Sequence, residues 1–116
     1  MRYMLLLYGD ETEDSDMTPE QWDTIIAAHN AFGAEARERG LNPTGEALQP
    51  TATASTVSFD NGRPAMATNG PFAETKEQLG GFYLLDCKDL DEALEMARKL
   101  PLRNGAVEVR PVIEFG

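Results

Sequence analysis

The chain has 116 residues, of which 41% are hydrophobic and 26% are charged, a balance typical of a globular protein with one core. Its 20 acidic residues outnumber its 10 lysines and arginines, and the formal net charge of −10 disfavours binding to nucleic acid or to an anionic membrane surface. Because there is one cysteine and one histidine, an intrachain disulfide and a Cys/His zinc site are both excluded.

The first part of the chain predicts a strand and then a long helix. Residues 2–8 are apolar in both alternating sets, as in a strand that is covered on both faces. Residues 18–21 form a helix start, with a threonine N-cap, a proline in the first helical position and a glutamine that closes a capping box. We expect the helix to run to Arg39 and to stop at Gly40. Its apolar stripe, which puts the histidine on the buried face, comprises Trp22, Ile25, Ile26, His29, Phe32 and Ala36.

A strongly acidic segment joins this strand to this helix. Residues 10–23 hold seven acids and no base. The EF-hand calcium template fails here, because Ser15 stands where glycine is required and Gln21 stands where the bidentate glutamate is required. The sequence therefore predicts no metal site, but a solvated, mobile loop over 10–16 whose charges favour the positive end of the following helix.

The rest of the chain predicts a mainly β region and a second helix. Asn61-Gly62 between two β-like runs is typical of a hairpin turn. Gly80-Gly81 inside a strand requires a bulge, a close backbone approach or a ligand. The expected elements are a short strand over 45–49, hairpin strands over 56–59 and 64–68, a loop over 69–78, a strand over 79–87, a helix over 89–100 and a strand over 106–115.

This order of elements predicts the fold class. It is the α+β, ferredoxin-like split βαβ pattern, in which an antiparallel sheet carries two helices on one face. The two central strands are apolar on both faces, whereas the helices cover one, so we expect the sheet of a second copy to cover the other. The sequence thus predicts a homodimer whose subunit is a single domain over residues 1–116. No run near the start is long enough for a signal peptide or a membrane span, and we expect a cytoplasmic protein.

One run of the sequence is specific enough to indicate a family. Residues 69–86, NGPFAETKEQLGGFYLLD, resemble the signature of the YCII-related, or DGPF-domain, family. The opening MRYMLLLYGDE, the segment GEALQPTATASTV, the helix DLDEALEMARKLP and the ending VEVRPVIEF are also similar, so the resemblance covers nearly the whole chain. The resemblance implies a ferredoxin-like fold that forms a dimeric α+β barrel. It also implies a bacterial cytoplasmic protein without assigned activity, of a kind often found alongside extracytoplasmic-function sigma factors.

The chain departs from the family pattern at one position. Better-studied YCII relatives have a cleft with a histidine and an aspartate that are proposed as catalytic, and the family run begins with Asp where this chain has Asn69. An amide keeps hydrogen-bonding capacity but does not exchange a proton near neutral pH. A general acid or base at this position would therefore be lost, whereas a residue that only caps a turn would be nearly equivalent.

The candidate site residues each have a structural alternative. His29 is either a core or interface histidine or a ligand-binding or proton-transfer group at the mouth of the barrel. The turn at 69–72 is either only rigid, or it holds Phe72, Glu74 and Lys76 at a pocket rim, where the two charges could grip a zwitterionic or carboxylated metabolite. The same two charges could instead be solvated surface groups. Trp22, Phe32, Tyr8 and Tyr83 are expected to be core residues rather than a cofactor cage, or one of the tyrosines lines the interior with its hydroxyl satisfied. Cys87 is expected to be a buried hydrophobe.

Three functions follow from these residues. The first is a dimeric module that binds a small metabolite between the first helix and the sheet, near His29, Asn69 and Phe72. The second is an enzyme of lyase, isomerase or hydrolase type that uses His29 as acid or base, with Asn69 orienting the substrate. The third is a regulatory module whose acidic segment over 10–23 binds a protein partner such as a sigma factor. None of the three requires a cofactor.

Overall fold

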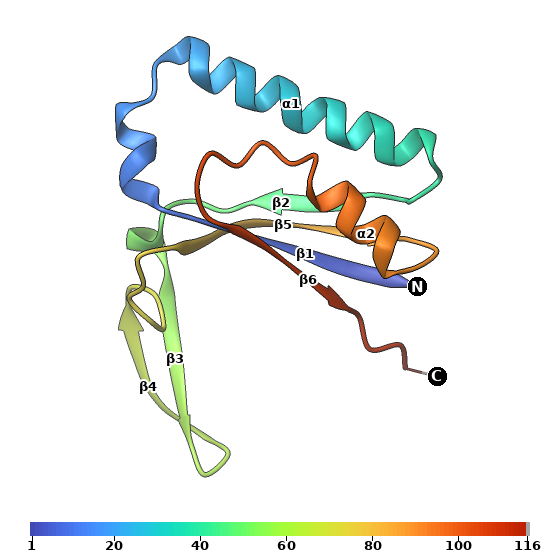
Figure 1. Ribbon diagram of the computed structural model, residues 1–116. Coiled ribbons are helices and arrows are strands. Elements are labelled where there is room, and N and C mark those ends of the chain that lie inside the picture. Colours follow the sequence, from blue (N-terminus) through green and yellow to red (C-terminus); the bar gives the residue numbers. More distant parts are fainter. Residues whose placement is uncertain (116) are drawn as a thin grey trace.

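The computed structural model describes residues 1–115, and a four-stranded antiparallel sheet carries two helices on one face (Figure 1). The strand order is β2-β5-β1-β6, so β1 and β5 are central and the two edge strands flank them. This order is compatible with the predicted ferredoxin-like pattern. The elements of this layer are β1 (Arg2–Gly9), α1 (Pro19–Glu38), β2 (Thr44–Ala47), β5 (Gln78–Asp86), α2 (Leu90–Ala97) and β6 (Ala106–Pro111).

A two-stranded sheet stands apart from this layer. Strands β3 (Ser55–Asp60) and β4 (Arg63–Asn69) pair only with each other, which confirms the predicted hairpin. Its turn residues Asn61 and Gly62 have φ of 50° and 77°, as a type I′ turn requires. Two 3₁₀ helices, η1 (Glu11–Asp16) and η2 (Thr51–Thr53), complete the fold.

The helix start was predicted well, whereas the ends of two elements and one loop were not. Thr18 accepts from the Gln21 amide and Gln21 closes the capping box, while Gly40 with φ of 76° follows the end of α1. Helix α2 ends at Ala97 rather than at residue 100, and β6 ends at Pro111 rather than at residue 115. The prediction of a loop over 10–16 is wrong, because residues 11–16 form η1, which starts where the Asp10 side chain accepts a hydrogen bond from the Thr12 amide.

The core lies between the helices and the two central strands. Leu5, Leu85, Met96 and Cys87 are fully buried there, and Phe32 of α1 packs onto the same cluster. Burial raises the pKa of the Cys87 thiol, as expected for a structural cysteine. The structure explains both glycines of β5. The register between β1 and β5 shifts beside Gly80, as at a bulge, and a Cβ atom on Gly81 would lie only 2.9 Å from the Glu46 carbonyl oxygen of the neighbouring strand.

The sheet face opposite the helices has an apolar centre that no layer formed by residues 1–115 covers. Because Leu5 and Leu85 point to the helices, their neighbours Met4 and Leu84 point away, as do Leu6 and Phe82. The register pairs Met4 with Leu84 and Leu6 with Phe82, so these four half-buried side chains form one patch, called here the open face.

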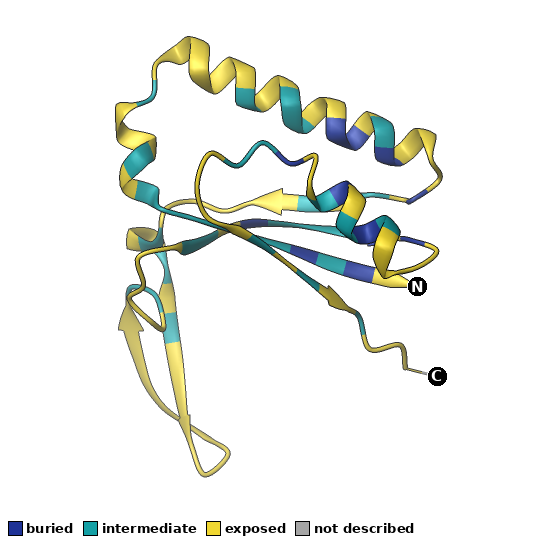
Figure 2. Cartoon of the chain, viewed as in Figure 1, coloured by how far each residue is buried: buried dark blue, intermediate teal, exposed yellow. Residues whose placement is uncertain are grey.

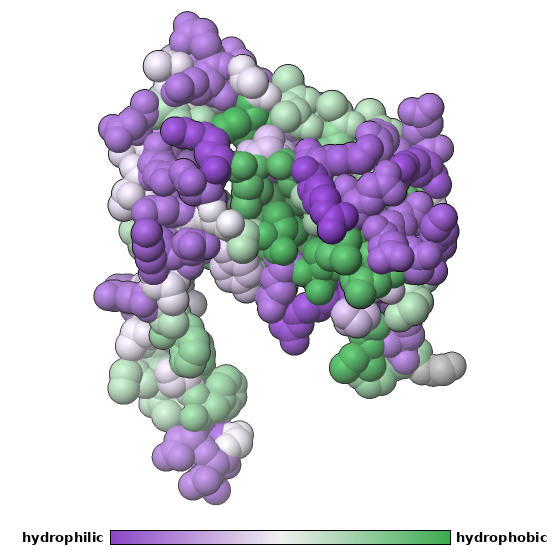
Figure 3. Space-filling view, viewed as in Figure 1, coloured by the Kyte–Doolittle hydropathy of each residue, from purple (hydrophilic) through white to green (hydrophobic). Residues whose placement is uncertain are grey.

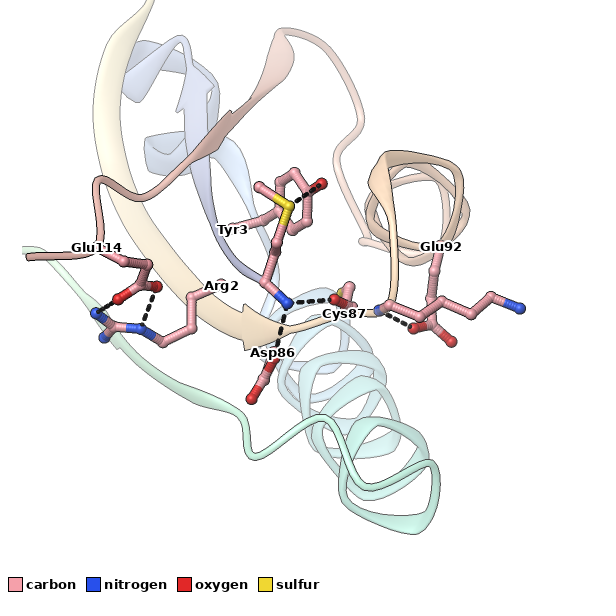
Figure 4. Close-up of polar contacts among 8 residues, drawn as sticks. Arg2, Tyr3, Asp86, Cys87, Glu92 and Glu114 are labelled. Atoms are coloured by element: carbon pink, nitrogen blue, oxygen red, sulfur yellow. Dashed lines mark hydrogen bonds and ion pairs between the residues drawn. The ribbon is translucent and has the colours of Figure 1, made fainter. Parts of the chain in front are cut away.

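Polar contacts at one end of the sheet join the first residues of the chain to the end of β5 and to the segment after β6 (Figure 4). The Arg2 guanidinium donates twice to the Glu114 carboxylate, at 2.9 Å each, and the Val112 amide donates to the Arg2 carbonyl at 2.9 Å. The Met1 ammonium donates to the Cys87 carbonyl and contacts the Asp86 carboxylate. These contacts place the segment after β6 along the edge of the open face.

The chain is flatter and more extended than a compact monomer of its size. Its accessible surface is 8241 Å², whereas about 6,200 Å² is expected for a compact monomer of this mass. Its radius of gyration is 16.2 Å, against about 13.4 Å for a compact domain of this length. The hairpin is almost entirely exposed and adds to this surface (Figure 2). None of the helices among the described residues is long and apolar enough to cross a membrane.

Candidate functional site

The main hollow of the structure is an open cleft of about 590 Å³ between α1 and the sheet. The N-terminal half of α1 forms its roof, and the last residues of β1 and the first residues of β5 form its floor. Helix η1 and the segment after α2 form its mouth. In Figure 3, hydrophobic side chains are visible below α1 between two hydrophilic flanks. A smaller hollow of about 300 Å³ adjoins this cleft at Ile26 and His29.

The apolar stripe of α1 is packed in its second half and unpacked in its first half. Phe32 is 3% exposed and Ala36 is fully buried, as predicted. Trp22 is 41% exposed and Ile26 is 54% exposed, and both line the cleft instead of contacting a core. An apolar helix face with empty space beneath it is a surface suited to an apolar ligand.

His29 lies where the packed half of α1 meets the unpacked half. Its Nδ1 atom is 2.7 Å from the Tyr83 hydroxyl of β5, and the two rings are stacked with centroids 5.8 Å apart. Phe32 packs on the other side of Tyr83, with a centroid distance of 4.6 Å. Burial lowers the pKa of His29 and raises the pKa of Tyr83, so both groups are uncharged near neutral pH.

The pairing with Tyr83 leaves the other ring nitrogen of His29 for a ligand. Within residues 1–115, Nδ1 is the imidazole atom that makes a hydrogen bond. If the phenol donates to Nδ1, then Nε2 carries the proton and donates to a ligand; in the other tautomer, Nε2 accepts. Either way, Tyr83 orients the imidazole, which is how an acid–base or ligand-binding histidine is held.

Four carboxylates stand at the mouth of the cleft, on or beside η1. Glu11 accepts at 2.8 Å from both the amide and the hydroxyl of Thr51, and its own amide donates to Gln78. Glu13 accepts from Asn104. Burial is the main cause that raises the pKa of Asp14, and the charges of Glu11 and Glu13 raise it further. These contacts join η1 to the segments that carry η2 and β5, so the acidic segment is a structural wall of the cleft.

The structure brings together some of the predicted site residues and not others. His29 and Tyr8 line the cleft. Asn69, Phe72, Glu74 and Lys76 are not among the lining residues; Asn69 ends β4, and Phe72 is 88% exposed. Lys76 is close enough to Asp10 to lower the pKa of that carboxyl, although a hydrogen bond from Thr12 is the main cause.

Sequence reasoning missed the partner of the histidine. Tyr83 was expected to be a core residue, or one whose hydroxyl is satisfied inside the protein, without any link to His29. The available signal was the alternation in β5, which puts Tyr83 on the same face as Leu85, beneath the helix. Within the described part of the chain there is no group of three or more His, Cys, Asp or Glu side chains that could hold a metal ion.

The lowered pKa of His29 predicts a pH-dependent stability. Between about pH 6.5, where an unfolded histidine titrates, and the lower pKa of the folded state, the unfolded chain binds more protons. The free energy of unfolding should therefore fall as the pH falls through this range, and most of this loss should be absent in His29→Gln. Because the imidazole is half-exposed, the loss should stay well below the limit of about 1.4 kcal/mol per pH unit for one proton. Urea denaturation at pH 7.5, 6.5 and 5.5 and at one protein concentration measures it; equal slopes in both proteins would contradict the prediction.

Comparison with known proteins agrees with the resemblance seen in the sequence. A protein-family model, the YCII-related domain, matches residues 1–116. An uncharacterized protein of Rhizobium meliloti (strain 1021) is 42% identical to this chain over an alignment 116 residues long. The alignment covers 97% of this chain and 92% of that protein. A match over the full length of the chain and a relative this similar show that the chain belongs to the YCII-related family.

Proposed function

We propose that this protein binds a small organic ligand in the cleft between α1 and the sheet. The observation that carries the proposal is the unpacked half of the α1 stripe, where Trp22 and Ile26 line a cleft of about 590 Å³ although the same stripe is buried two turns later. This volume is in the range of small-molecule sites, which are mostly apolar with a few polar groups. His29 is such a polar group, held by Tyr83.

The groups around the cleft limit the chemistry of the ligand. The apolar roof and floor favour an aliphatic or aromatic body, and His29 favours one hydrogen bond with that body. The four carboxylates of Asp10, Glu11, Glu13 and Asp14 line the mouth together with Arg103, and Lys76 lies near Asp10, so negative charge is in excess there. Because like charges repel in a partly desolvated site, we infer that the ligand is uncharged or cationic rather than a carboxylate or phosphate.

We further propose that two copies associate through the open face into a dimeric α+β barrel, in a bacterial, cytoplasmic protein. The half-buried apolar patch of Met4, Leu6, Phe82 and Leu84 supports this, because an apolar patch that is partly open to solvent at the centre of a sheet favours association. The accessible surface also exceeds that of a compact monomer by about 2,000 Å², and a standard interface takes about 800 Å² from each partner.

A thermal-shift screen against uncharged, cationic and anionic metabolites tests the proposed site. A ligand at 100 times its dissociation constant stabilises the native state by about 2.7 kcal/mol, which gives a visible shift for a chain of this size. We expect hits among the uncharged or cationic compounds. The shift should be lost in Ile26→Lys and weakened in His29→Ala.

Ala27→Lys is the matched control, because Ala27 is exposed on α1, next to Ile26, but does not line the cleft. It should keep the shift, as should Asn69→Ala. Equal loss in Ile26→Lys and Ala27→Lys would contradict a site in this cleft. Loss in Asn69→Ala would show that the loop after β4 takes part after all.

The His29–Tyr83 pair also favours the enzyme alternative, because an oriented neutral imidazole can act as acid or base. A ligand found in the screen is the compound to test for turnover. In that case His29→Gln should abolish the turnover while the ligand still stabilises the protein.

A further inference from the structure

The hairpin β3–β4 lacks the contacts that would hold a two-stranded sheet in place. Its strands pair with each other and with no other strand, and it projects from the body of the protein (Figure 1). At its base, the Gly70 amide donates to Ala54 and the Thr56 hydroxyl donates to Gly70. An isolated two-stranded hairpin is at best marginally stable in water. A further surface is therefore needed to stabilise this one.

The two sides of the hairpin differ in chemistry. The register pairs Val57 with Ala67 and Phe59 with Pro64, and the register shifts between Ser58 and Phe59. Alternation puts Val57 and Phe59 on one side, and this shift lets Pro64 and Ala67, three residues apart, face the same side, called here the apolar side. Val57 is 55% exposed and Phe59 is 67% exposed. The other side carries Thr56, Ser58 and Thr68 with one large apolar residue, Met66. A two-stranded ribbon with one apolar side and one mainly polar side is suited to packing its apolar side on another surface.

The position of the hairpin indicates where that surface is. Both helices cover one face of the main sheet, and the hairpin projects toward the opposite side, as does the segment after β6 (Figure 1). That segment is also apolar, with Ile113 at 74% and Phe115 at 91% exposure. The open face thus lies between two exposed apolar segments of the same chain.

We propose that the hairpin is an intersubunit arm, whose apolar side packs against a second copy of this chain seated on the open face. The inference rests on the proposed sheet-to-sheet dimer and adds a second contact surface to it. By two-fold symmetry each chain gives one arm and receives one, so the contact closes at two copies. The accessible surface of the single chain supports a second copy as the partner of the hairpin. The four residues of the open face are already half-buried, so the arm is needed to account for the surface excess of about 2,000 Å².

Sedimentation velocity over a range of protein concentrations tests the arm with a matched pair of variants. Phe59→Glu puts a charge on the apolar side, and Ser58→Glu puts the same charge on the other side of the same strand. We expect Phe59→Glu to raise the dissociation constant of the dimer at least tenfold and Ser58→Glu to change it less than about threefold. Because Phe59 is exposed within its own chain, far-UV circular dichroism should show an unchanged fold in both variants.

A third variant, Leu84→Lys on the open face, separates the arm from the sheet interface. If Leu84→Lys dissociates the dimer and Phe59→Glu does not, the arm is overturned and the sheet interface stands. If Phe59→Glu dissociates it and Leu84→Lys does not, the sheet interface is wrong, and so is the seat proposed for the arm. A wild-type chain that stays monomeric at 100 µM overturns both, without bearing on the ligand screen.

Isotope-filtered NOEs in a mixed dimer of ¹³C-labelled and unlabelled chains give a direct readout. We expect contacts from the Phe59 ring and the Val57 methyl groups to protons of the other chain. If these side chains contact only their own chain, the hairpin folds back on its own subunit and the proposal is overturned.

Discussion

Replacing Leu84 with lysine is expected to convert the proposed dimer into monomers, with a dissociation constant at least about 100-fold higher than that of the wild type. Leu84 points away from the helices and pairs with Met4 at the centre of the open face. Burial of a leucine contributes about 1.5 kcal/mol or more, and a symmetric interface loses that contribution twice. A total of about 3 kcal/mol corresponds to more than 100-fold in the dissociation constant.

The measurement is sedimentation velocity from about 1 to 100 µM chain. Ala27→Lys is the control, because it adds the same charge on the outer face of α1, away from the sheet. Both variants should retain helix and strand content, since neither side chain belongs to the buried core. A Leu84→Lys protein that sediments as the wild-type dimer would show that the open face is not the interface.

The parts of the fold that rest on local contacts could be predicted from the sequence. The start of α1 depends on hydrogen bonds between Thr18 and Gln21, three residues apart, and both residues are visible in the sequence. The hairpin turn depends on the positive φ of Asn61 and Gly62, which that dipeptide favours. Side-chain alternation then divides β1 and β5 into two apolar sets, one on the core side and one on the open face.

The wall of the cleft could not be predicted, because it depends on contacts between distant segments. In isolation the acidic segment is solvated and has no hydrophobic period. In the structure its shape depends on the bonds of Glu11 with Thr51 and Gln78, which lie 40 and 67 residues away. The same is true of the His29–Tyr83 pair, whose members are 54 residues apart on different elements.

The loop after β4 shows the limit of reading a site from a motif. One interpretation of the rigid NGPF turn put Phe72, Glu74 and Lys76 at a pocket rim, and the other left the two charges as solvated surface groups. The structure places all three on the surface, outside the cleft of their own chain. Turn chemistry predicts where a chain reverses, whereas the surface that the loop faces depends on tertiary and quaternary packing.

Phe32→Ala should lower the free energy of unfolding by about 3–5 kcal/mol, whereas Trp22→Ala should change it by less than about 1 kcal/mol. Both residues belong to the same predicted stripe of α1, and tryptophan is the larger of the two. Phe32 is 3% exposed and packs on Tyr83, so its loss leaves a cavity in the core. Trp22 is 41% exposed at the roof of an open cleft, so its loss removes few contacts.

Thermal unfolding at one protein concentration measures the difference, with an expected fall in Tm on the order of 10–20 °C for Phe32→Ala and only a few degrees for Trp22→Ala. Adding a ligand from the screen should narrow the difference between the two variants, because Trp22→Ala should then lose most of the ligand-induced shift. If Trp22→Ala is as destabilising as Phe32→Ala without ligand, then Trp22 is buried in solution and the cleft is closed. If it is not, stability does not require an apolar residue at position 22, as the proposed ligand site predicts.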